Sequence, residues 1–280
     1  MILVTGATGN IGTELVAALS NSGTAVRALV RDPARAQLPT GVEAVTGDLN
    51  RPESLTEALD GVTRMFLLPG YADTPDLLAR AKKAGVQHIV LLSGGSAALQ
   101  DMHNAVSAYM TQAERDVRES GLTWTFMRPR SFMSNALRWL PQLAQGDVIR
   151  AQFPDVPVAA IDPADIAAVA AVALTGGELA GRILELTGAR ALVPADQIAV
   201  LAEVLERPLV CAGLTNEQTR AELEATMPQK YVDAFWSFFV DGTLDESQVY
   251  PTVREVTGRE PRTFEQWARA HADAFTAPAQ

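Results

Sequence analysis

The first half of the chain alternates short apolar runs with segments whose apolar residues recur every three or four positions. Short apolar runs are typical of buried strands, whereas the longer period is typical of helices packed on one face. The expected strands are residues 2–5, 25–30, 43–46, 64–68, 87–92 and 123–128, and helices are expected at residues 53–59, 75–84 and 105–120. This alternation predicts an α/β protein whose parallel sheet is covered by helices on both faces.

Beyond residue 135 the alternation weakens, and the helical segments become longer and richer in large apolar residues. Strands are expected at residues 156–161 and 182–186, and helices at residues 197–205 and 263–275. Asp162 and Pro163 suit the start of a further helix, because Asp can cap free N–H groups and Pro fits the first turn. We therefore expect a larger domain at residues 1–134 and a smaller, mainly helical portion at residues 135–280 that contributes some strands to the sheet.

A glycine-rich loop joins the first strand to a helix. Gly6, Gly9 and Gly12 follow one another at three-residue intervals, directly after the strand and before a helical apolar stripe. Glycine leaves no Cβ where the chain turns sharply, or where a pyrophosphate lies on bare backbone N–H groups. Tight turns also recruit glycine, but the strand and helix on either side are the context that a nucleotide-binding loop requires. The loop therefore predicts dinucleotide binding.

Cofactor preference depends on the end of the second strand, where Arg31 and Asp32 stand. A carboxylate there hydrogen-bonds the ribose hydroxyls of NAD, whereas a cation accommodates the 2′-phosphate of NADP. Arg31 comes first, and a guanidinium can pair with phosphate and lie flat on adenine. The sequence thus favours NADP(H) over NAD(H). The alternative is a solvated Arg–Asp pair that only begins a loop.

Composition and charge exclude several classes of function. The chain has 280 residues, 48% of them hydrophobic, which is enough for a large core. Its net charge of −10 repels nucleic-acid phosphates and anionic membranes, and no local basic patch offsets this charge. The single cysteine, Cys211, cannot form an intrachain disulfide, and no signal-like segment precedes the first strand. We expect a cytoplasmic protein without nucleic-acid or membrane partners.

Metal and serine-hydrolase chemistry are not expected. The three histidines, His88, His103 and His271, have no metal-ligand spacing, and His88 lies inside a strand pattern. Ser93 and Ser96 have no histidine at a recognisable spacing, so a catalytic triad is improbable.

The motifs resemble those of the NmrA-like branch of the atypical short-chain dehydrogenase/reductase family, which includes NADPH-dependent quinone reductases and triphenylmethane dye reductases. The resemblance covers nearly the whole chain and is most specific in residues 4–12, in residues 47 and 48, and in residues 121–129 with Phe132 and Asn135. It implies a Rossmann-type doubly wound parallel sheet, NADP(H) binding and a cleft against a small substrate-binding portion. It leaves the activity open, because the branch resembles both reductases and redox-sensing proteins.

The resemblance also implies roles for residues at the carboxyl ends of the strands, where ligands lie in such sheets. For the phosphates and adenosine, these are Gly6, Thr8, Gly9, Asn10 and Ile11 at the pyrophosphate, Arg31 at the 2′-phosphate, Asp48 and Leu49 at adenine, and Leu68, Pro69 and Gly70 beneath the ribose. For the nicotinamide end, they are Ser93 and Gly94 by the ribose, and Pro129, Ser131 and Phe132 by the ring. Asp48 as a mere turn residue and residues 93–95 as a plain loop are the alternatives.

The usual proton donor of the superfamily is missing. Its main body is similar in using a Tyr-x-x-x-Lys pair, in which the lysine lowers the pKa of the phenol from about 10. Here Tyr109 is followed four residues later by Ala113, and the lysine or histidine that often stands in this helix of the NmrA-like branch is absent at Met110 and Thr111. Tyr109 and Ser93 remain as candidate catalytic residues, although Tyr109 fits the core-facing stripe of its helix equally well.

Aromatic residues in the second half suggest the kind of substrate. Trp139, Phe235, Trp236 and Phe239 are expected to form a wall suited to a small, flat apolar acceptor, although packing alone would also explain them. One hypothesis is NADPH-dependent reduction of a quinone or conjugated dye by direct hydride transfer, for which a dedicated acid is dispensable. The other is a non-catalytic NADP(H)-binding redox sensor or regulator, which the missing Tyr–Lys pair favours.

Overall fold

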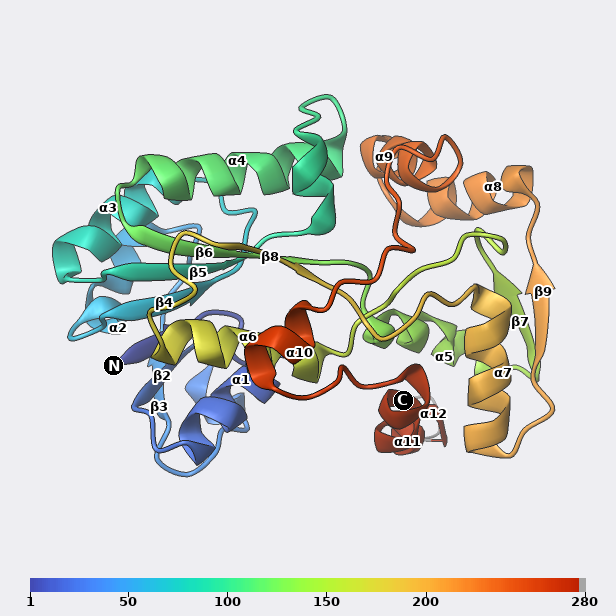
Figure 1. Cartoon of the computed structure of the whole chain (residues 1–280), viewed down its shortest axis with the longest axis horizontal. Helices are drawn as coiled ribbons and strands as arrows, with labels where there is room; N and C mark the ends of the chain where they lie inside the picture. Colours follow the sequence, from blue (N-terminus) through green and yellow to red (C-terminus); the bar gives the residue numbers. More distant parts are fainter. Residues whose placement is uncertain (277–280) are drawn as a thin grey trace.

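A seven-stranded parallel sheet forms the centre of the computed structural model, which describes residues 1–276 (Figure 1). The strands are β1 (Ile2–Val4), β2 (Val26–Val30), β3 (Glu43–Thr46), β4 (Arg64–Leu67), β5 (His88–Leu92), β6 (Thr123–Pro129) and β8 (Ile183–Leu186). Their spatial order is β3-β2-β1-β4-β5-β6-β8. The order changes direction between β1 and β4, which is the switch point where open sheets of this kind hold ligands at the carboxyl ends of their strands.

Helices cover both faces of the sheet. One face is covered by α1 (Asn10–Asn21), α6 (Pro163–Thr175) and α10 (Thr252–Thr257). The other face is covered by α2 (Thr56–Leu59), α3 (Thr74–Ala84) and α4 (Ala105–Glu119). Figure 1 shows α1 and α6 on one side of the sheet and α3 and α4 on the other. Successive strand residues point to opposite faces, so Ile2 and Val4 pack with Leu15 of α1 while Leu3 packs with Leu77 of α3. The predicted fold class, a doubly wound α/β sheet, is confirmed.

The second half of the chain divides between the sheet and a smaller third core. The elements α6, β8 and α10 belong to the layers of the sheet. The third core is built from the 3₁₀ helix η4 (Met133–Trp139), α5 (Leu140–Leu143), β7 (Val148–Ala151), α7 (Pro194–Leu205), β9 (Val210–Gly213), α11 (Phe264–Ala270) and α12 (Ala272–Thr276). Helices α8 (Asn216–Thr226) and α9 (Gln229–Phe239) lie at one end of this part in Figure 1. The division at residue 134 remains a prediction, and residues 277–280 of its second part lie outside the described residues.

The prediction of a strand at residues 156–161 is wrong. This segment is extended but forms only isolated bridges, outside any named strand. Its N–H groups bond to three separate segments instead of one partner strand, namely Val158 to Leu192, Ala159 to Glu246 and Ile161 to Ser131. The apolar run is therefore a buried connection between the two parts of the molecule.

Other boundaries also differ from the predicted ones. Residues 53–59 form a 3₁₀ turn, η2 (Pro52–Leu55), before the short helix α2, and the helix expected at residues 197–205 begins at Pro194. The expected final helix is broken at His271 into α11 and α12, because the backbone of His271, with a φ of −117° and a ψ of 15°, departs from helical geometry. Strands β7 and β9, which pair in parallel, have no predicted counterpart, since each is short and half exposed.

His88 is a packed residue in the central strand β5. Its Nε2 lies 2.9 Å from Thr125 Oγ1, and the Thr125 hydroxyl donates its own proton to the Leu179 carbonyl. Nε2 of His88 therefore carries the proton that it donates to Thr125. Burial lowers the pKa of His88, and the nearby Arg64 cation lowers it further.

We expect His88→Gln to make folding less sensitive to mild acid. A buried neutral histidine lowers the free energy of unfolding as the pH falls through the pKa of about 6.5 that it has in the unfolded chain. The reason is that the unfolded chain binds a proton at this pH and the native state does not. Glutamine keeps a donor for Thr125 without titrating. The free energy of unfolding, measured with urea at about pH 7.5 and about pH 5, should therefore fall less for the variant. An equal fall in both proteins would contradict this assignment.

Candidate active site

The glycine loop bends at Gly6 and packs directly against α1. Gly6 has a φ of +60°, and the N–H of Gly9 donates to the Gly6 carbonyl at 2.9 Å. A Cβ on Gly12 would overlap that same carbonyl, whereas a Cβ on Gly9 would approach it only to 3.3 Å. Gly12 is therefore required by the packing of helix on loop, and the exposed Gly9 is the position where a ligand can approach the backbone.

Helix α1 begins with uncapped backbone donors. Its N-cap residue, Gly9, has no side chain to bond the first N–H groups, and its first turn holds no acidic residue. Such a terminus combines free N–H groups with partial positive charge, which fits a pyrophosphate. Thr8 and Asn10 are exposed beside it, while Ile11 is buried in the core. Asn10 Nδ2 also donates to Ser134 Oγ at 3.3 Å, which connects the loop to η4.

The end of β4 is held beside the glycine loop. Thr5 Oγ1 accepts a hydrogen bond from the N–H of Leu68 at 3.2 Å, and a Cβ on Gly6 would meet Leu68 Cδ1 at 2.5 Å. Gly70 turns the chain with a φ of +92°, facing the ring of Tyr109. Leu68 thus lies against the glycine loop, and the expected place of residues 68–70 beneath the ribose stays a prediction.

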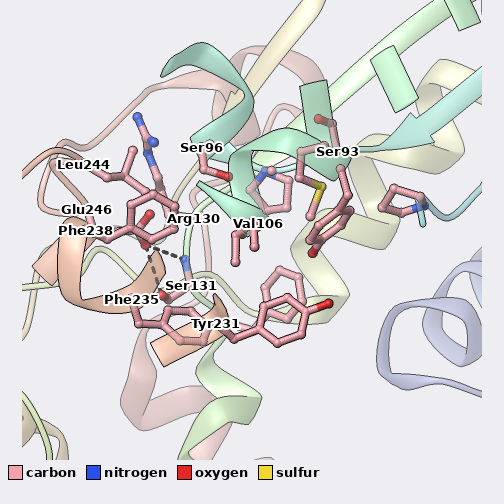
Figure 2. A pocket seen from close by; sticks show the side chains of 18 of the residues that line it. Ser93, Ser96, Val106, Arg130, Ser131, Tyr231, Phe235, Phe238, Leu244 and Glu246 are labelled. Atoms are coloured by element: carbon pink, nitrogen blue, oxygen red, sulfur yellow. Dashed lines mark hydrogen bonds between the residues drawn. The ribbon is translucent and has the colours of Figure 1, made fainter. Parts of the chain in front are cut away.

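A cleft of about 880 Å³ opens between these strand ends and α9 (Figure 2). The sheet side brings together the predicted residues Pro69, Gly70, Ser93, Gly94, Pro129, Ser131 and Phe132. The opposite side is aromatic, and Figure 2 shows Tyr231 and Phe235 across the cavity from Ser93 and Ser96. A space of this size and lining suits a small organic ligand.

The aromatic side of the cleft comes from one face of α9. Phe235 and Phe239 line it as expected, with parallel rings whose centroids are 6.1 Å apart. Tyr231 and Phe238 line it as well. Residues three and four apart share one helix face, so these four side chains reach the same cavity.

The two tryptophans expected in this wall lie elsewhere. Trp236 is one position away from Phe235, and its ring packs instead beneath the guanidinium of Arg220 in α8, 5.1 Å from the ring centroid. Trp139 is 2% exposed in the third core and borders a second hollow beside the cleft. The apolar pattern identified these residues as buried, but it did not reveal the helix face on which each one stands.

The predicted adenosine contacts lie at the ends of β2 and β3. Arg31 is exposed and has no hydrogen bond or ion pair within residues 1–276. Asp32 does not pair with it: its carboxylate caps η1 (Pro33–Arg35) and lies 3.4 Å from Arg35. Asp48 accepts a hydrogen bond from the N–H of Asn50 at 2.9 Å in a local turn, and the adjacent Leu49 is buried. Arg31 is thus free to meet a phosphate.

Ser93 is bound into a buried ionic network. Its hydroxyl donates to Glu114 Oε1 at 2.7 Å, and Glu114 is 2% exposed. Arg128 holds that carboxylate with two bonds of 2.8 Å, and Glu185 lies 3.5 Å from Arg128. Burial alone would lower the pKa of Arg128, but the two glutamates raise it above its usual value. The Ser93 hydroxyl therefore serves to stabilise a buried charge. Glu114 could have been suspected from its position on the apolar face of its helix.

Tyr109 reaches the cleft from α4 and is 36% exposed. Its hydroxyl has no hydrogen bond within the described residues. Burial raises the pKa of Tyr109 above its usual value, and Tyr231 raises it further. Lys230 also borders the cleft, but its ammonium lies over the Tyr231 ring, 5.0 Å from the centroid. The phenol is therefore protonated at neutral pH and is a weak acid.

Besides Lys230, the charged residues Glu246 and Arg130 border the cleft, and sequence reasoning assigned neither of them to the site. Glu246 is 7% exposed, and its Oε2 accepts hydrogen bonds from the Ser131 N–H at 2.9 Å and hydroxyl at 3.0 Å (Figure 2). Arg130, also 7% exposed, lies 3.4 Å from the Tyr250 hydroxyl and 3.6 Å from Glu185. Glu246 is 115 positions from Ser131, so no local pattern could have paired them.

Within residues 1–276, no group of three or more His, Cys, Asp or Glu side chains is arranged to hold a metal ion. Over the same residues, no helix has the length and apolar character needed to cross a bilayer. The expected cytoplasmic location and the expected lack of nucleic-acid partners stay predictions.

The sequence is similar to known reductases over its whole length. A model of a family described as NAD(P)H-binding matches residues 6–176. A (4-alkanoyl-5-oxo-2,5-dihydrofuran-3-yl)methyl phosphate reductase from Streptomyces griseus is 41% identical, covering 98% of this chain and 99% of that protein. An NAD(P)H azoreductase from Xenophilus azovorans is 36% identical, covering 99% of this chain and all of that protein.

Solved structures share the fold that the resemblance implied. The NADPH-dependent quinone oxidoreductase QOR2 of Escherichia coli, complexed with NADPH, has 24% identity and a TM-score of 0.80, covering 97% of this chain and 99% of that one. The negative transcriptional regulator NmrA has 21% identity and a TM-score of 0.75, covering 96% of this chain and 94% of that one.

We expect Gly9→Val to abolish dinucleotide binding and to leave a folded protein. The new Cβ meets only the Gly6 carbonyl at 3.3 Å, but the side chain would stand over the N–H groups at the start of α1. Cofactor titration and circular dichroism measure the two effects. In contrast, Gly12→Ala should both impair binding and lower the thermal midpoint of unfolding, because its Cβ overlaps the Gly6 carbonyl. Retained binding by Gly9→Val would show that the loop is only a turn.

We expect Arg31→Ala to weaken NADPH binding at least tenfold and to spare NADH, because a charge-assisted contact to phosphate contributes about 1.5–3 kcal/mol. Arg35→Ala is the matched control, since Arg35 is already paired with Asp32. Both cofactors are titrated against all three proteins. Equal losses for the two cofactors, or a wild-type preference for NADH, would refute the assignment of Arg31 to the 2′-phosphate.

Proposed function

The chain belongs to the NAD(P)H-binding family as an oxidoreductase related to known reductases, and we propose that it transfers hydride from NADPH to a flat, conjugated acceptor. The substrates that its two relatives are named for, an unsaturated lactone phosphate and an azo compound, share an electron-poor double bond. When bound, the cofactor supplies two electrons and one proton as hydride, and a second proton from water completes the reduced product. Quinones, azo dyes and acylated butenolides are the acceptor classes that fit this chemistry.

The shape of the cleft carries the proposal. Pro129, Ser131 and Phe132 at the end of β6 form the side expected to face the nicotinamide ring, and the aromatic face of α9 stands opposite. A flat acceptor between these two sides would stack on aromatic rings, which favour offset or edge contacts with other π-systems. The side chains of α9 thereby orient the acceptor parallel to the surface from which hydride arrives.

The side chains near the cleft support catalysis by positioning rather than by an obligatory acid. The Ser93 hydroxyl is committed to Glu114, and the phenol of Tyr109 has a raised pKa. Hydride transfer to a quinone, azo bond or enone leaves a delocalised anion that water can protonate. The rate then depends on holding the reacting atoms close and aligned, which can lower a barrier by about 7–11 kcal/mol.

A regulatory role is the second candidate. It is favoured by the absence of a Tyr-x-x-x-Lys pair at Tyr109 and Ala113. The fold is also shared with NmrA, a negative transcriptional regulator. A regulator of this kind would bind NADP(H) tightly. It would not oxidise NADPH, whichever acceptor is supplied.

The deciding experiment measures NADPH oxidation by the purified protein with a panel of quinones, azo dyes and acylated butenolides. Turnover with at least one class, dependent on both NADPH and acceptor, is the expected result. Tight NADPH binding without turnover by any class would instead support the regulatory role.

We expect Tyr109→Phe and Ser93→Ala each to reduce turnover by less than about tenfold, or about 1.4 kcal/mol, whereas a true general acid contributes about 10²- to 10⁴-fold. Ser93→Ala should also lower the thermal midpoint, because Glu114 loses a buried hydrogen bond. Initial rates and thermal melts measure both effects. A thousandfold loss in Tyr109→Phe, with NADPH binding intact, would make Tyr109 the proton donor.

A further inference from the structure

A second hollow of about 670 Å³ adjoins the cleft. The two cavities share the lining residues Ser131, Asn135, Met227, Phe235 and Phe239, so they lie directly beside each other. The shared residues are mostly apolar, whereas the far side of the second hollow is polar, with Arg138, Gln142, Arg150, Gln152 and Glu222. A molecule that occupies both cavities would therefore meet an aromatic region at one end and charged groups at the other.

The 3₁₀ helix η4 leads from one cavity to the other. Phe132, at its N-cap, lines the cleft, Asn135 lines both cavities, and Arg138 lines the second hollow. Residues three apart lie on the same face of a 3₁₀ helix and rise about 6 Å per turn. Arg138 thus lies two turns, or roughly 12 Å along the helix axis, from the residue expected beside the nicotinamide ring.

Arg138 is a cation without a carboxylate partner within residues 1–276. The acid that borders the same hollow, Glu222, is already neutralised by Arg150, at 2.7 Å and 3.0 Å, and accepts a further hydrogen bond from Gln152 at 3.3 Å. The guanidinium carbon of Arg138 lies over the ring of Trp139, 5.5 Å from the ring centroid. The positive charge in this hollow is therefore uncompensated.

Arg138 is exposed as a whole residue, although neighbouring atoms partly enclose its guanidinium. Burial lowers the pKa of Arg138 from its usual value, and no acidic group raises it again. A guanidinium nevertheless stays charged near neutral pH. An unpaired guanidinium that lines a hollow can bind carboxylate or phosphate oxygens with two parallel hydrogen bonds.

We propose that Arg138 binds an anionic group, a phosphate ester or a carboxylate, on the acceptor whose conjugated bond lies in the main cleft. This inference rests on the proposed function and gives the flat apolar acceptor a charged end. Asn135 stands between the two sites, where its amide can bond the polar linkage that joins them. Arg138 is thus a specificity-determining residue for acceptors with an anion about two helical turns from the reducible bond.

The test uses three acylated butenolides that differ in one substituent: a hydroxymethyl group, its phosphate ester, and a carboxymethyl group. Arg138→Met keeps an unbranched apolar stem and removes the charged guanidinium. Its KM should rise at least tenfold for the phosphate, the carboxylate or both, with little change in kcat and none for the neutral alcohol. The difference between the two anionic compounds identifies which anion the site prefers, and Arg138→Lys should recover part of the loss.

Arg115→Met is the matched control, because Arg115 is exposed on α4 and its loss changes the net charge equally. This variant should behave like the wild type with all three compounds. The proposal is overturned if the wild type treats neutral and anionic acceptors alike, if Arg138→Met affects the neutral alcohol equally, or if Arg115→Met shows the same shift.

A binding measurement separates this proposal from the proposed function. Calorimetric titration of the phosphate ester, the carboxylate and the neutral alcohol into protein saturated with NADP⁺ requires no turnover. Arg138→Met should weaken the binding of at least one anion tenfold and leave the alcohol unchanged. If no acceptor oxidises NADPH but this loss is seen, the reductase proposal fails and the anion site stands. If turnover occurs but the anions bind equally well to the wild type and to Arg138→Met, only the anion-site proposal fails and the reductase proposal stands.

Discussion

Helix α1 rests on the glycine loop with no side chain between them, and the position of its first N–H groups at the edge of the sheet follows from that contact. Gly12 has no Cβ because the Gly6 carbonyl occupies that place. The axis of α1 therefore points its uncapped N–H groups at the switch point between β1 and β4. The hydrogen bond from Leu68 to Thr5 then holds the end of β4 against the same loop. A larger residue at Gly12 would displace the helix and the phosphate site together.

A buried ionic network sets the second constraint. Glu114 is held by Arg128 and Ser93 beneath the cleft, at the end of β5. Removing one partner of such a buried pair leaves an uncompensated charge and typically costs about 3–5 kcal/mol. The hydroxyl of Ser93, a candidate catalytic group in the sequence, is here part of this buried network. This commitment explains why the proposed chemistry depends on orientation of the acceptor.

The C-terminal part is joined to the sheet by a small number of polar contacts around the cleft. Asn10 bonds Ser134, Asn104 bonds the Ala234 carbonyl in α9, and Glu246 bonds Ser131. Each contact joins a residue at a strand end or helix start to one in the covering part. The width of the cleft is therefore determined by contacts between residues far apart in the sequence.

The sequence by itself determined the strands of the sheet, the glycine loop, the switch-point architecture and the class of cofactor. Those features depend on local rules: the period of apolar residues, the conformational freedom of Gly6, and the order of strands and helices. Only the tertiary structure decided that Ser93 bonds Glu114, that Glu246 meets Ser131, and that Phe235 faces the cleft while Trp236 faces α8. An apolar or polar pattern shows that a side chain is buried or exposed, but the partner it meets depends on the helix face and on segments up to 130 residues away. For the same reason the sequence could mark Arg138 only as one arginine among many, because its lack of a partner is a property of the folded chain.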